Sequence, residues 1–122
     1  MTNTDQTSIE HFMHTQVHCW NSGDKDGFFA AYKSIAPEVL TIEYVGTPSG
    51  DGWTILDGMW AQQQPKITIE EVALIVVGKE AVAHNRNNIK GTNMAIETIE
   101  HYRFDADGSV HVRYFIKQPS QS

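Results

Sequence analysis

The amino-acid sequence predicts an α+β fold, in which a curved antiparallel sheet forms a cone that cups helices near the N-terminus. Two observations predict this fold. Apolar residues recur at helical spacing between residues 7 and 35, whereas residues 66–117 read as four strands separated by short loops that contain glycine. The chain has 122 residues, of which 40% are hydrophobic. One domain over 1–122 is therefore expected, with loose ends at about 1–6 and 119–122.

Two helices are expected first. One covers about 7–20, where Thr7 opens a capping box before an apolar stripe at Ile9, Phe12, Met13, Val17 and Trp20. The other can be capped by Asp24 and ends before Pro37, with a stripe at Phe28, Phe29, Tyr32 and Ile35. Gln16 lies in the middle of the first stripe, so its amide points at the core and needs a polar partner.

A short hairpin and a third helix are expected next. Residues 39–45 alternate and are rich in β-forming side chains, residues 47–52 have loop chemistry, and residues 53–56 would form the second strand. The third helix would cover 59–64, because Pro65 is incompatible with its continuation. Four strands would then follow at about 66–77, 80–90, 93–105 and 109–117.

The pairing of the last three strands decides which residues face the interior. A turn at Gly91 places Arg86 opposite Glu97 on one face of the sheet, which is a favourable charge pair. On the other face the same register sets Ala83 opposite Glu100.

Two loop lengths are open for the last hairpin. A two-residue turn at 107–108 would place His111, Arg113 and Phe115 beside Glu100. A three-residue loop that ends in Gly108 is favoured, because it matches apolar side chains across the strands. On this choice the inner face holds Asn85, Asn87, Thr98, Glu100, Tyr102, Phe104, Val112, Tyr114 and Ile116.

Glu100 is the strongest chemical signal in the chain. On the inner face it is an acidic side chain among aromatic rings, and buried acids usually bind or catalyse. Burial raises the pKa of a carboxyl group, so Glu100 could act as a protonated donor or as a general base. The alternative is a structural carboxylate that is satisfied by Gln16, Tyr114 or solvent.

Four short phrases carry a resemblance to a known superfamily over nearly the whole chain. They are Trp20–Asp24, Ala36–Glu38, Thr41–Glu43 and Ile99–Asp105. In this order they resemble the NTF2-like superfamily, and within it the SnoaL-like and ketosteroid-isomerase-like groups. The resemblance implies a cone-shaped α+β barrel of the cystatin and NTF2 type, with a deep pocket. It also implies a homodimer packed through the outer face of the sheet.

The match to the ketosteroid isomerases is incomplete at their catalytic positions. In that group a catalytic Asp follows the first strand, while a helix Tyr and a second Asp form the oxyanion hole. Here the base position carries Tyr44, the helix position falls near Gln16, and the second acid is Glu100. The resemblance therefore implies a pocket that lacks the carboxylate needed for the steroid reaction.

Further candidate site residues would line the interior or its mouth. Tyr44 and Tyr114 are candidate catalytic groups beside Glu100, and they could equally be core fillers. A register error would turn Asn85 and Asn87 to solvent, and tryptophans at the mouth could instead pack in the core. The candidate ligand-binding residues are Gln16, Trp53, Trp60, Asn85, Asn87, Thr98 and Tyr102.

Composition argues against several functions. Nine basic and fifteen acidic residues give a formal net charge of −6, which disfavours a nucleic-acid partner. No apolar run approaches the roughly 18 residues of a membrane span, and Cys19 is the only cysteine, so a cytoplasmic protein is expected. His14 and His18 lie on the polar face of the first helix, so neither a metal nor a cofactor is expected.

Two hypotheses for function follow. The first is a homodimer whose cavity binds a small apolar or aromatic molecule, with cofactor-free acid/base chemistry of isomerase, cyclase or hydratase type at Glu100. The second is a non-catalytic ligand-binding or association module. It would work through the outer face of the sheet, where Ile99 and Phe115 are expected to be exposed.

Overall fold

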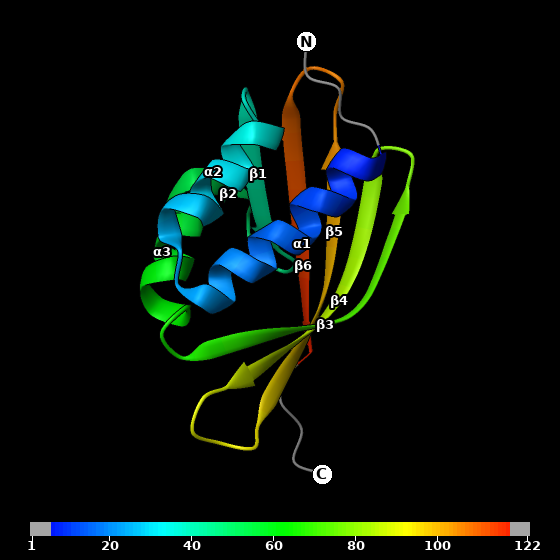
Figure 1. Cartoon of the computed structure of the whole chain (residues 1–122). Helices are drawn as coiled ribbons and strands as arrows, with labels where there is room; N and C mark the ends of the chain where they lie inside the picture. The colour runs from blue at the N-terminus through cyan, green and yellow to red at the C-terminus, as the bar shows by residue number, and fades with distance from the viewer. Residues whose placement is uncertain (1–5, 118–122) are drawn as a thin grey trace.

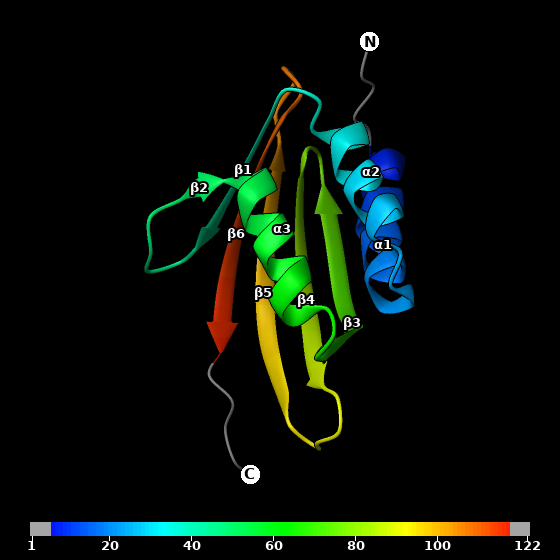
Figure 2. The same ribbon diagram turned by 90° about the vertical axis from the view of Figure 1, so that its left-hand side faces the viewer.

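The computed structural model describes residues 6–117. Three helices lie against one face of a curved six-stranded sheet, which confirms the predicted α+β fold class (Figure 1 and Figure 2). The helices are α1 (Gln6–Ser22), α2 (Lys25–Ile35) and α3 (Gly52–Gln63). The strands are β1 (Val39–Tyr44), β2 (Gly50–Asp51), β3 (Ile67–Val77), β4 (Glu80–Ile89), β5 (Ala95–Phe104) and β6 (Ser109–Lys117).

Helices α1 and α2 bury the stripes that the sequence predicts. The buried residues of α1 include Gln16, and the side chain of Asp24 caps α2 by accepting a hydrogen bond from the Gly27 N–H at 3.0 Å. Helix α1 begins at Gln6, so Thr7 lies inside the helix and the capping box is not at its end. The predicted loose ends otherwise lie outside the described residues.

The segment 53–56 is helical, so its prediction as a strand is wrong. Asp51 ends the two-residue strand β2 and caps α3, accepting hydrogen bonds from the Thr54 N–H at 3.1 Å and from its hydroxyl at 2.8 Å. Leu56 of α3 is fully buried. Capping and burial therefore outweigh the local preference of Trp53, Thr54 and Ile55 for a strand.

The sheet has the order β2-β1-β6-β5-β4-β3. Strand β1 runs parallel to β6, which corrects the prediction of a purely antiparallel sheet, while the other neighbours are antiparallel. The predicted register is confirmed, because Glu100 lies opposite Ala83 on one side and Tyr114 on the other. The three-residue loop is also confirmed, since the Asp105 N–H donates to the Ser109 carbonyl and Gly108 has a φ of +89°.

An aromatic core fills the space between α1, α2 and the middle of the sheet. Phe12 packs edge-on against Tyr32 with a centroid distance of 4.8 Å, and against Tyr102 and Phe104 at 6.0 Å each. Tyr32 and Tyr102 have no exposed surface. Because Phe12 packs against both Tyr32 of α2 and Tyr102 of β5, this core fixes the position of α2 relative to β5.

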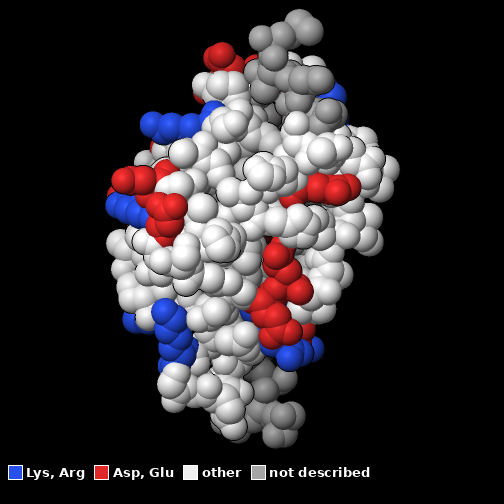
Figure 3. All heavy atoms as spheres, in the orientation of Figure 1, with Lys and Arg blue, Asp and Glu red and all other residues white. Residues whose placement is uncertain are grey.

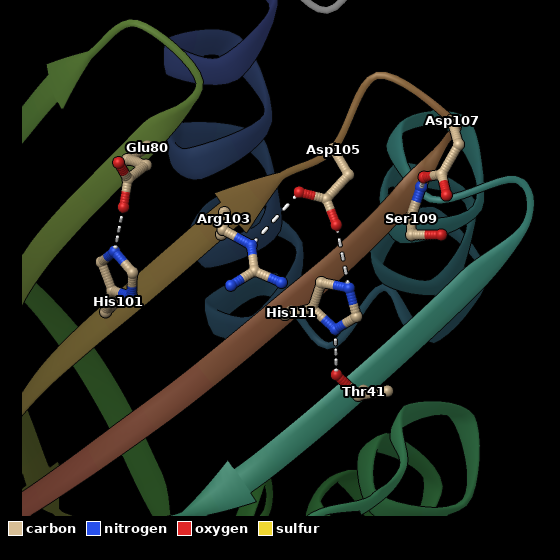
Figure 4. A network of polar contacts seen from close by, with 8 residues as sticks. All are labelled: Thr41, Glu80, His101, Arg103, Asp105, Asp107, Ser109 and His111. Carbon is tan, nitrogen blue, oxygen red and sulfur yellow. Dashed lines mark hydrogen bonds and ion pairs between the residues drawn. The ribbon is translucent and has the colours of Figure 1, made fainter.

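The outer face of the sheet is lined by paired charges. His101 contacts Glu80 at 2.8 Å, and Asp105 contacts both Arg103 and His111 (Figure 4). On the helical side, acidic and basic side chains form small separate groups with neutral surface between them (Figure 3). In the described part of the chain, no helix has the length and apolarity to cross a membrane.

Candidate ligand-binding cavity

A cavity of about 290 Å³ lies between the helices and the inner face of the sheet. Its wall is mostly apolar and includes Trp20 and Phe28 from the first two helices, Met59 from α3, and Ile67, Ile69 and Ile96 from the sheet. Ile116, which is 46% exposed, also lines it and lies near the end of β6. The cavity therefore occupies the wide end of the cone, next to the solid aromatic core.

Hydrogen bonds between α1 and β3 fix one side of this wall. The amide of Asn21 donates to the Ile69 carbonyl and accepts from the Ile69 N–H, both at 2.8 Å. The indole N–H of Trp20 donates to the Ile67 carbonyl at 3.0 Å. These bonds attach the C-terminal end of α1 to the start of β3. They therefore set the positions of Trp20, Ile67 and Ile69, which line the cavity.

Glu100 lies on the cavity wall with only 6% of its surface exposed. Its Oε1 accepts a hydrogen bond from the Tyr102 hydroxyl at 2.9 Å. Its Oε2 accepts from the Thr98 hydroxyl at 2.9 Å and from the Asn85 amide at 3.1 Å. Glu100 is therefore hydrogen-bonded by Asn85, Thr98 and Tyr102. The sequence had suggested Gln16 or Tyr114 as partners of a structural carboxylate, and neither is hydrogen-bonded to it.

A second layer of hydrogen bonds orients these donors. The Asn87 amide donates to the Thr98 hydroxyl at 3.2 Å and to the Ile96 carbonyl at 2.8 Å. The Tyr32 hydroxyl lies 3.4 Å from that of Tyr102. Asn87 can donate to Thr98 and Tyr32 to Tyr102, so the network leaves the hydroxyl protons of Thr98 and Tyr102 free to be donated to Glu100.

No cationic side chain among residues 6–117 pairs with Glu100. Within residues 6–117 no Lys, Arg or His lines the cavity, and no ion pair includes Glu100. Burial therefore raises the pKa of Glu100 above its ordinary value of 4.5, and the hydrogen bonds from Thr98, Tyr102 and Asn85 oppose that rise without cancelling it. Such a carboxyl group holds its proton more strongly than one in water.

Tyr114 lies opposite Glu100 on the neighbouring strand β6, and Tyr44 lies opposite Tyr114 on β1. Tyr44 and Tyr114 line the cavity, and their rings stack with a centroid distance of 5.4 Å. Burial raises the pKa of both phenols, and the charge of Glu100 adds to the rise. Both hydroxyls therefore keep their protons at neutral pH, and that of Tyr114 also interacts with the hydroxyls of Tyr32 and Tyr102.

Gln16 is the polar group that α1 contributes to the cavity. Only 4% of its surface is exposed, and its amide has no hydrogen bond to any other residue between 6 and 117. No fully buried side-chain nitrogen or oxygen among residues 6–117 lacks a partner, so the amide atoms of Gln16 keep a small exposed surface, and the residue lines the cavity. A bound molecule could therefore use the Gln16 amide as a donor or an acceptor.

The other candidate residues divide between the wall and the core. Asn85, Asn87 and Thr98 line the cavity, whereas the wall does not include Tyr102, Trp53 or Trp60. Tyr102 reaches the site through its bond to Glu100. Trp60 packs behind Trp20 at a centroid distance of 5.5 Å, and half-buried Trp53 has the Lys33 ammonium 6.0 Å from its ring.

Several wall residues were not among the predicted site residues. They include Trp20, Phe28 and Tyr32, which the sequence places in the apolar stripes of the first two helices. A stripe shows that a side chain faces inward, but it does not distinguish a packed core from the wall of a cavity. Met59 and Gln63 lie within the predicted helix 59–64, but nothing in the sequence indicated which face of that helix is turned to the cavity.

Four of the six histidines contact carboxylates away from the cavity. His14, His84, His101 and His111 each contact a carboxylate on the surface, at 2.7 to 3.1 Å. Between residues 6 and 117 no group of three or more His, Cys, Asp or Glu side chains is arranged to hold a metal ion. Cys19 is a buried thiol, and burial raises its pKa, so it has the character of a packing residue.

Comparisons with known proteins identify the fold. No protein-family model matches the chain, and no curated protein matches its sequence. Among solved structures, a "putative ketosteroid isomerase" from Kribbella flavida aligns with a TM-score of 0.73 at 13% identity, covering 95% of this chain and 82% of that one. An NTF2-like protein of unknown function from Burkholderia xenovorans aligns with a TM-score of 0.72 at 13% identity, covering 98% and 91%.

A third solved structure belongs to the SnoaL-like group named by the resemblance. This protein of unknown function from Burkholderia thailandensis aligns with a TM-score of 0.61 at 16% identity, covering 89% of this chain and 95% of that one. These three alignments cover 89–98% of this chain and 82–95% of the matched chains. The chain therefore has the NTF2-like fold, shared with SnoaL-like and ketosteroid-isomerase-like proteins.

Proposed function

We propose that this chain binds a small apolar or aromatic molecule in the cavity, with Glu100 holding the polar end of that molecule. The observation that carries the proposal is a buried carboxyl group, hydrogen-bonded by three neutral donors, on the wall of an otherwise mostly apolar cavity of about 290 Å³. A protein that needed only a core would gain more by filling this space with apolar side chains. A polar group maintained there at a cost in stability is typical of a binding site.

The same geometry suits cofactor-free acid/base chemistry. Glu100 would accept a proton from the bound molecule, because its raised pKa makes it a stronger base than an exposed carboxylate. Tyr44 and Tyr114 would donate hydrogen bonds to the oxyanion that forms as the proton leaves. Gln16 would orient the molecule, and the rings of Trp20 and Phe28 would exclude water.

An isomerase reaction illustrates the proton balance. A proton leaves one carbon of the ligand for Glu100, the electron pair moves into a conjugated oxyanion, and the proton returns to a different carbon of the same molecule. Cyclase and hydratase reactions can begin with the same proton transfer. No redox agent or cofactor takes part in any of these steps.

The test of this proposal is Glu100→Gln, with Glu97→Gln as the matched control. Both residues lie on β5, but Glu97 belongs to the outer face, where it pairs with His84. Small aromatic molecules are screened by calorimetry for binding to the wild-type protein, and activity is measured on any that are converted. We expect Glu100→Gln to lower turnover at least a hundredfold with the fold intact. Unchanged activity toward a confirmed substrate would remove Glu100 from catalysis.

A second candidate function is association through the outer face of the sheet, with a second copy of the chain as the partner. Ile99 and Phe115 lie directly opposite each other on this face and are 42% and 39% exposed. The same face carries both signs of charge, such as Arg103 and Glu97, so two copies can present complementary charges to each other. The cavity and this face are on opposite sides of the sheet, so both functions can coexist.

The association proposal has its own test. Ile99→Asp places a charge at the centre of the proposed contact, and we expect it to convert a dimer into a monomer on sedimentation. Met94→Asp is the control, because Met94 is 43% exposed but lies in the turn between β4 and β5. An unchanged sedimentation coefficient for Ile99→Asp would exclude this interface.

We also propose that the protein is cytoplasmic, in keeping with its single, unpaired cysteine, and we propose no nucleic-acid or membrane partner.

A further inference from the structure

The cavity contains a carboxyl group and no positive group. Every other titratable side chain that faces Glu100 is a phenol: Tyr32 from α2, Tyr44 from β1, Tyr102 from the same strand, and Tyr114 from β6. Helix α1 contributes only the neutral amide of Gln16, and β4 contributes the amides of Asn85 and Asn87. The described part of the chain therefore supplies hydrogen bonds to Glu100 but no countercharge.

Such an arrangement is incomplete by the ordinary rules of buried charge. A buried carboxylate is normally paired with a cation, because hydrogen bonds alone replace only part of its hydration. Thr98, Tyr102 and Asn85 each bring a group that can donate to within 3.1 Å of the carboxylate, so the protein can supply three hydrogen bonds to an ionised Glu100. A positive group from outside the protein would complete this site.

The rest of the wall is also suited to a cation. Rings of Trp20, Phe28, Tyr32, Tyr44 and Tyr114 line the cavity. Aromatic faces attract ammonium groups, and the attraction increases where water is excluded. A carboxylate or phosphate ligand would instead meet Glu100 with no Lys, Arg or His on the described wall to offset the repulsion.

We propose that the ligand of this cavity is a basic amine with an apolar or aromatic body, bound as its ammonium ion to Glu100 and between the aromatic rings of the wall. This inference rests on the proposed binding of an aromatic molecule with Glu100 at its polar end, and adds the charge of the ligand to it. For such a ligand Glu100 serves as the counter-ion and not as a general base. The free Gln16 amide provides a second polar contact, either to the ammonium group or to a polar substituent on the body.

A matched set of three probes tests the sign of the charge. Naphthylmethylamine is cationic, naphthylmethanol is neutral and naphthoate is anionic, while the aromatic body stays the same. Calorimetry at neutral pH measures the affinity of each probe for the full chain. We expect the amine to bind about tenfold more tightly than the alcohol or better, because an ammonium-carboxylate hydrogen bond is stronger than a neutral one. We expect the anion to bind least well.

Glu100→Gln shows whether this preference comes from the carboxylate. The variant should lose the preference for the amine over the alcohol while it still binds the alcohol. Should the variant fail to fold, the wild-type protein provides a second measurement. Affinity for the amine should decrease as the pH is lowered and Glu100 takes up its proton, whereas affinity for the alcohol should change little.

The outcomes separate this inference from the function on which it rests. Equal or tighter binding of the alcohol in the wild-type protein would overturn the amine assignment and leave a neutral ligand in the same cavity. A preference for the amine that persists in Glu100→Gln would also overturn it. Failure of all three probes to bind would overturn the proposed binding of aromatic molecules itself.

Discussion

The hydroxyl of Tyr102 donates a hydrogen bond of 2.9 Å to Oε1 of Glu100, two residues earlier on the same strand. Because alternate residues share a face, both side chains point into the cone. The Tyr32 hydroxyl lies 3.4 Å from that of Tyr102, so this bond also links the carboxyl group to α2. Glu100 is thus held at the boundary between the solid core and the cavity, in one orientation.

Removing this donor should cost stability. We expect Tyr102→Phe to lower the free energy of unfolding by about 1–2 kcal/mol, because a buried carboxylate oxygen and the Tyr32 hydroxyl both lose a partner. Chemical denaturation measures the change. Tyr44→Phe is the control, since Tyr44 makes no hydrogen bond to Glu100, and it should cost clearly less. Equal losses for the two variants would contradict the network described here.

The raised pKa of Glu100 predicts a dependence of stability on pH. The folded state holds the Glu100 proton more tightly than the unfolded state, so this residue contributes its full stability below its ordinary pKa of 4.5. That contribution is lost as the pH rises through the folded-state pKa. Unfolding free energies of the wild type and Glu100→Gln are measured over a pH series, and their difference removes the effect of all other groups.

We expect the wild type to lose stability relative to Glu100→Gln as the pH rises from about 4.5, at roughly 1.4 kcal/mol for each unit by which the pKa is raised. If the difference in unfolding free energy between the two proteins does not change with pH, the pKa of Glu100 is the same in the folded and unfolded states, and the predicted rise is wrong.

A larger side chain in the cavity should weaken the proposed binding of an aromatic molecule while Glu100 is left unchanged. Ile116 lines the cavity near the end of β6, and the next residue back, Phe115, is on the outer face. We expect Ile116→Trp to reduce the affinity for an aromatic probe at least tenfold, because the larger ring occupies the space of the ligand. Phe115→Trp should leave that affinity unchanged. Similar affinities for the two variants, measured by calorimetry, would place the ligand elsewhere.

The docking of α3 on β1 makes a separate prediction about two glycines. A Cβ at Gly52 would lie 2.7 Å from the Leu40 carbonyl oxygen and closer still to the Leu40 side chain, whereas nothing lies within 4 Å of a Cβ at Gly58. We expect Gly52→Ala to destabilise the fold by about 1–3 kcal/mol, because the buried backbone must shift. Gly58→Ala should instead stabilise the helix by up to about 1 kcal/mol. Thermal unfolding that ranks the two variants in the opposite order would show that α3 does not sit on β1 as described.

Sequence reasoning located the sheet and Glu100 because strand alternation and short loops are local signals. The pairing of Glu100 with Tyr114 follows from the length of one loop, which apolar matching decides. The parallel pairing of β1 with β6 joins segments far apart in the chain. No turn connects the two strands directly, so no turn residues in the sequence predict their pairing. The helical state of 53–56 depends on the cap at Asp51 and on burial of Leu56, and both outweigh local preference.

The partners of Glu100 were harder to predict than its position. The sequence placed Asn85 and Thr98 on the inner face but offered Gln16 and Tyr114 as the hydrogen-bonding groups. Side chains that share a face differ in reach, and strand periodicity carries no information on reach. The cavity itself depends on volumes left unfilled between α1, α3 and the sheet, and a linear pattern does not report these volumes.

Glu100 is a buried carboxyl group that faces the cavity, and no Lys, Arg or His among residues 6–117 lines the wall around it. A carbon NMR titration of glutamate-labelled protein tests this arrangement most directly, with the Glu100 signal assigned by its absence from Glu100→Gln. We predict a pKa above 4.5 in the free protein, and a decrease when naphthylmethylamine binds. A pKa at or below 4.5 that does not respond to the amine would contradict the account.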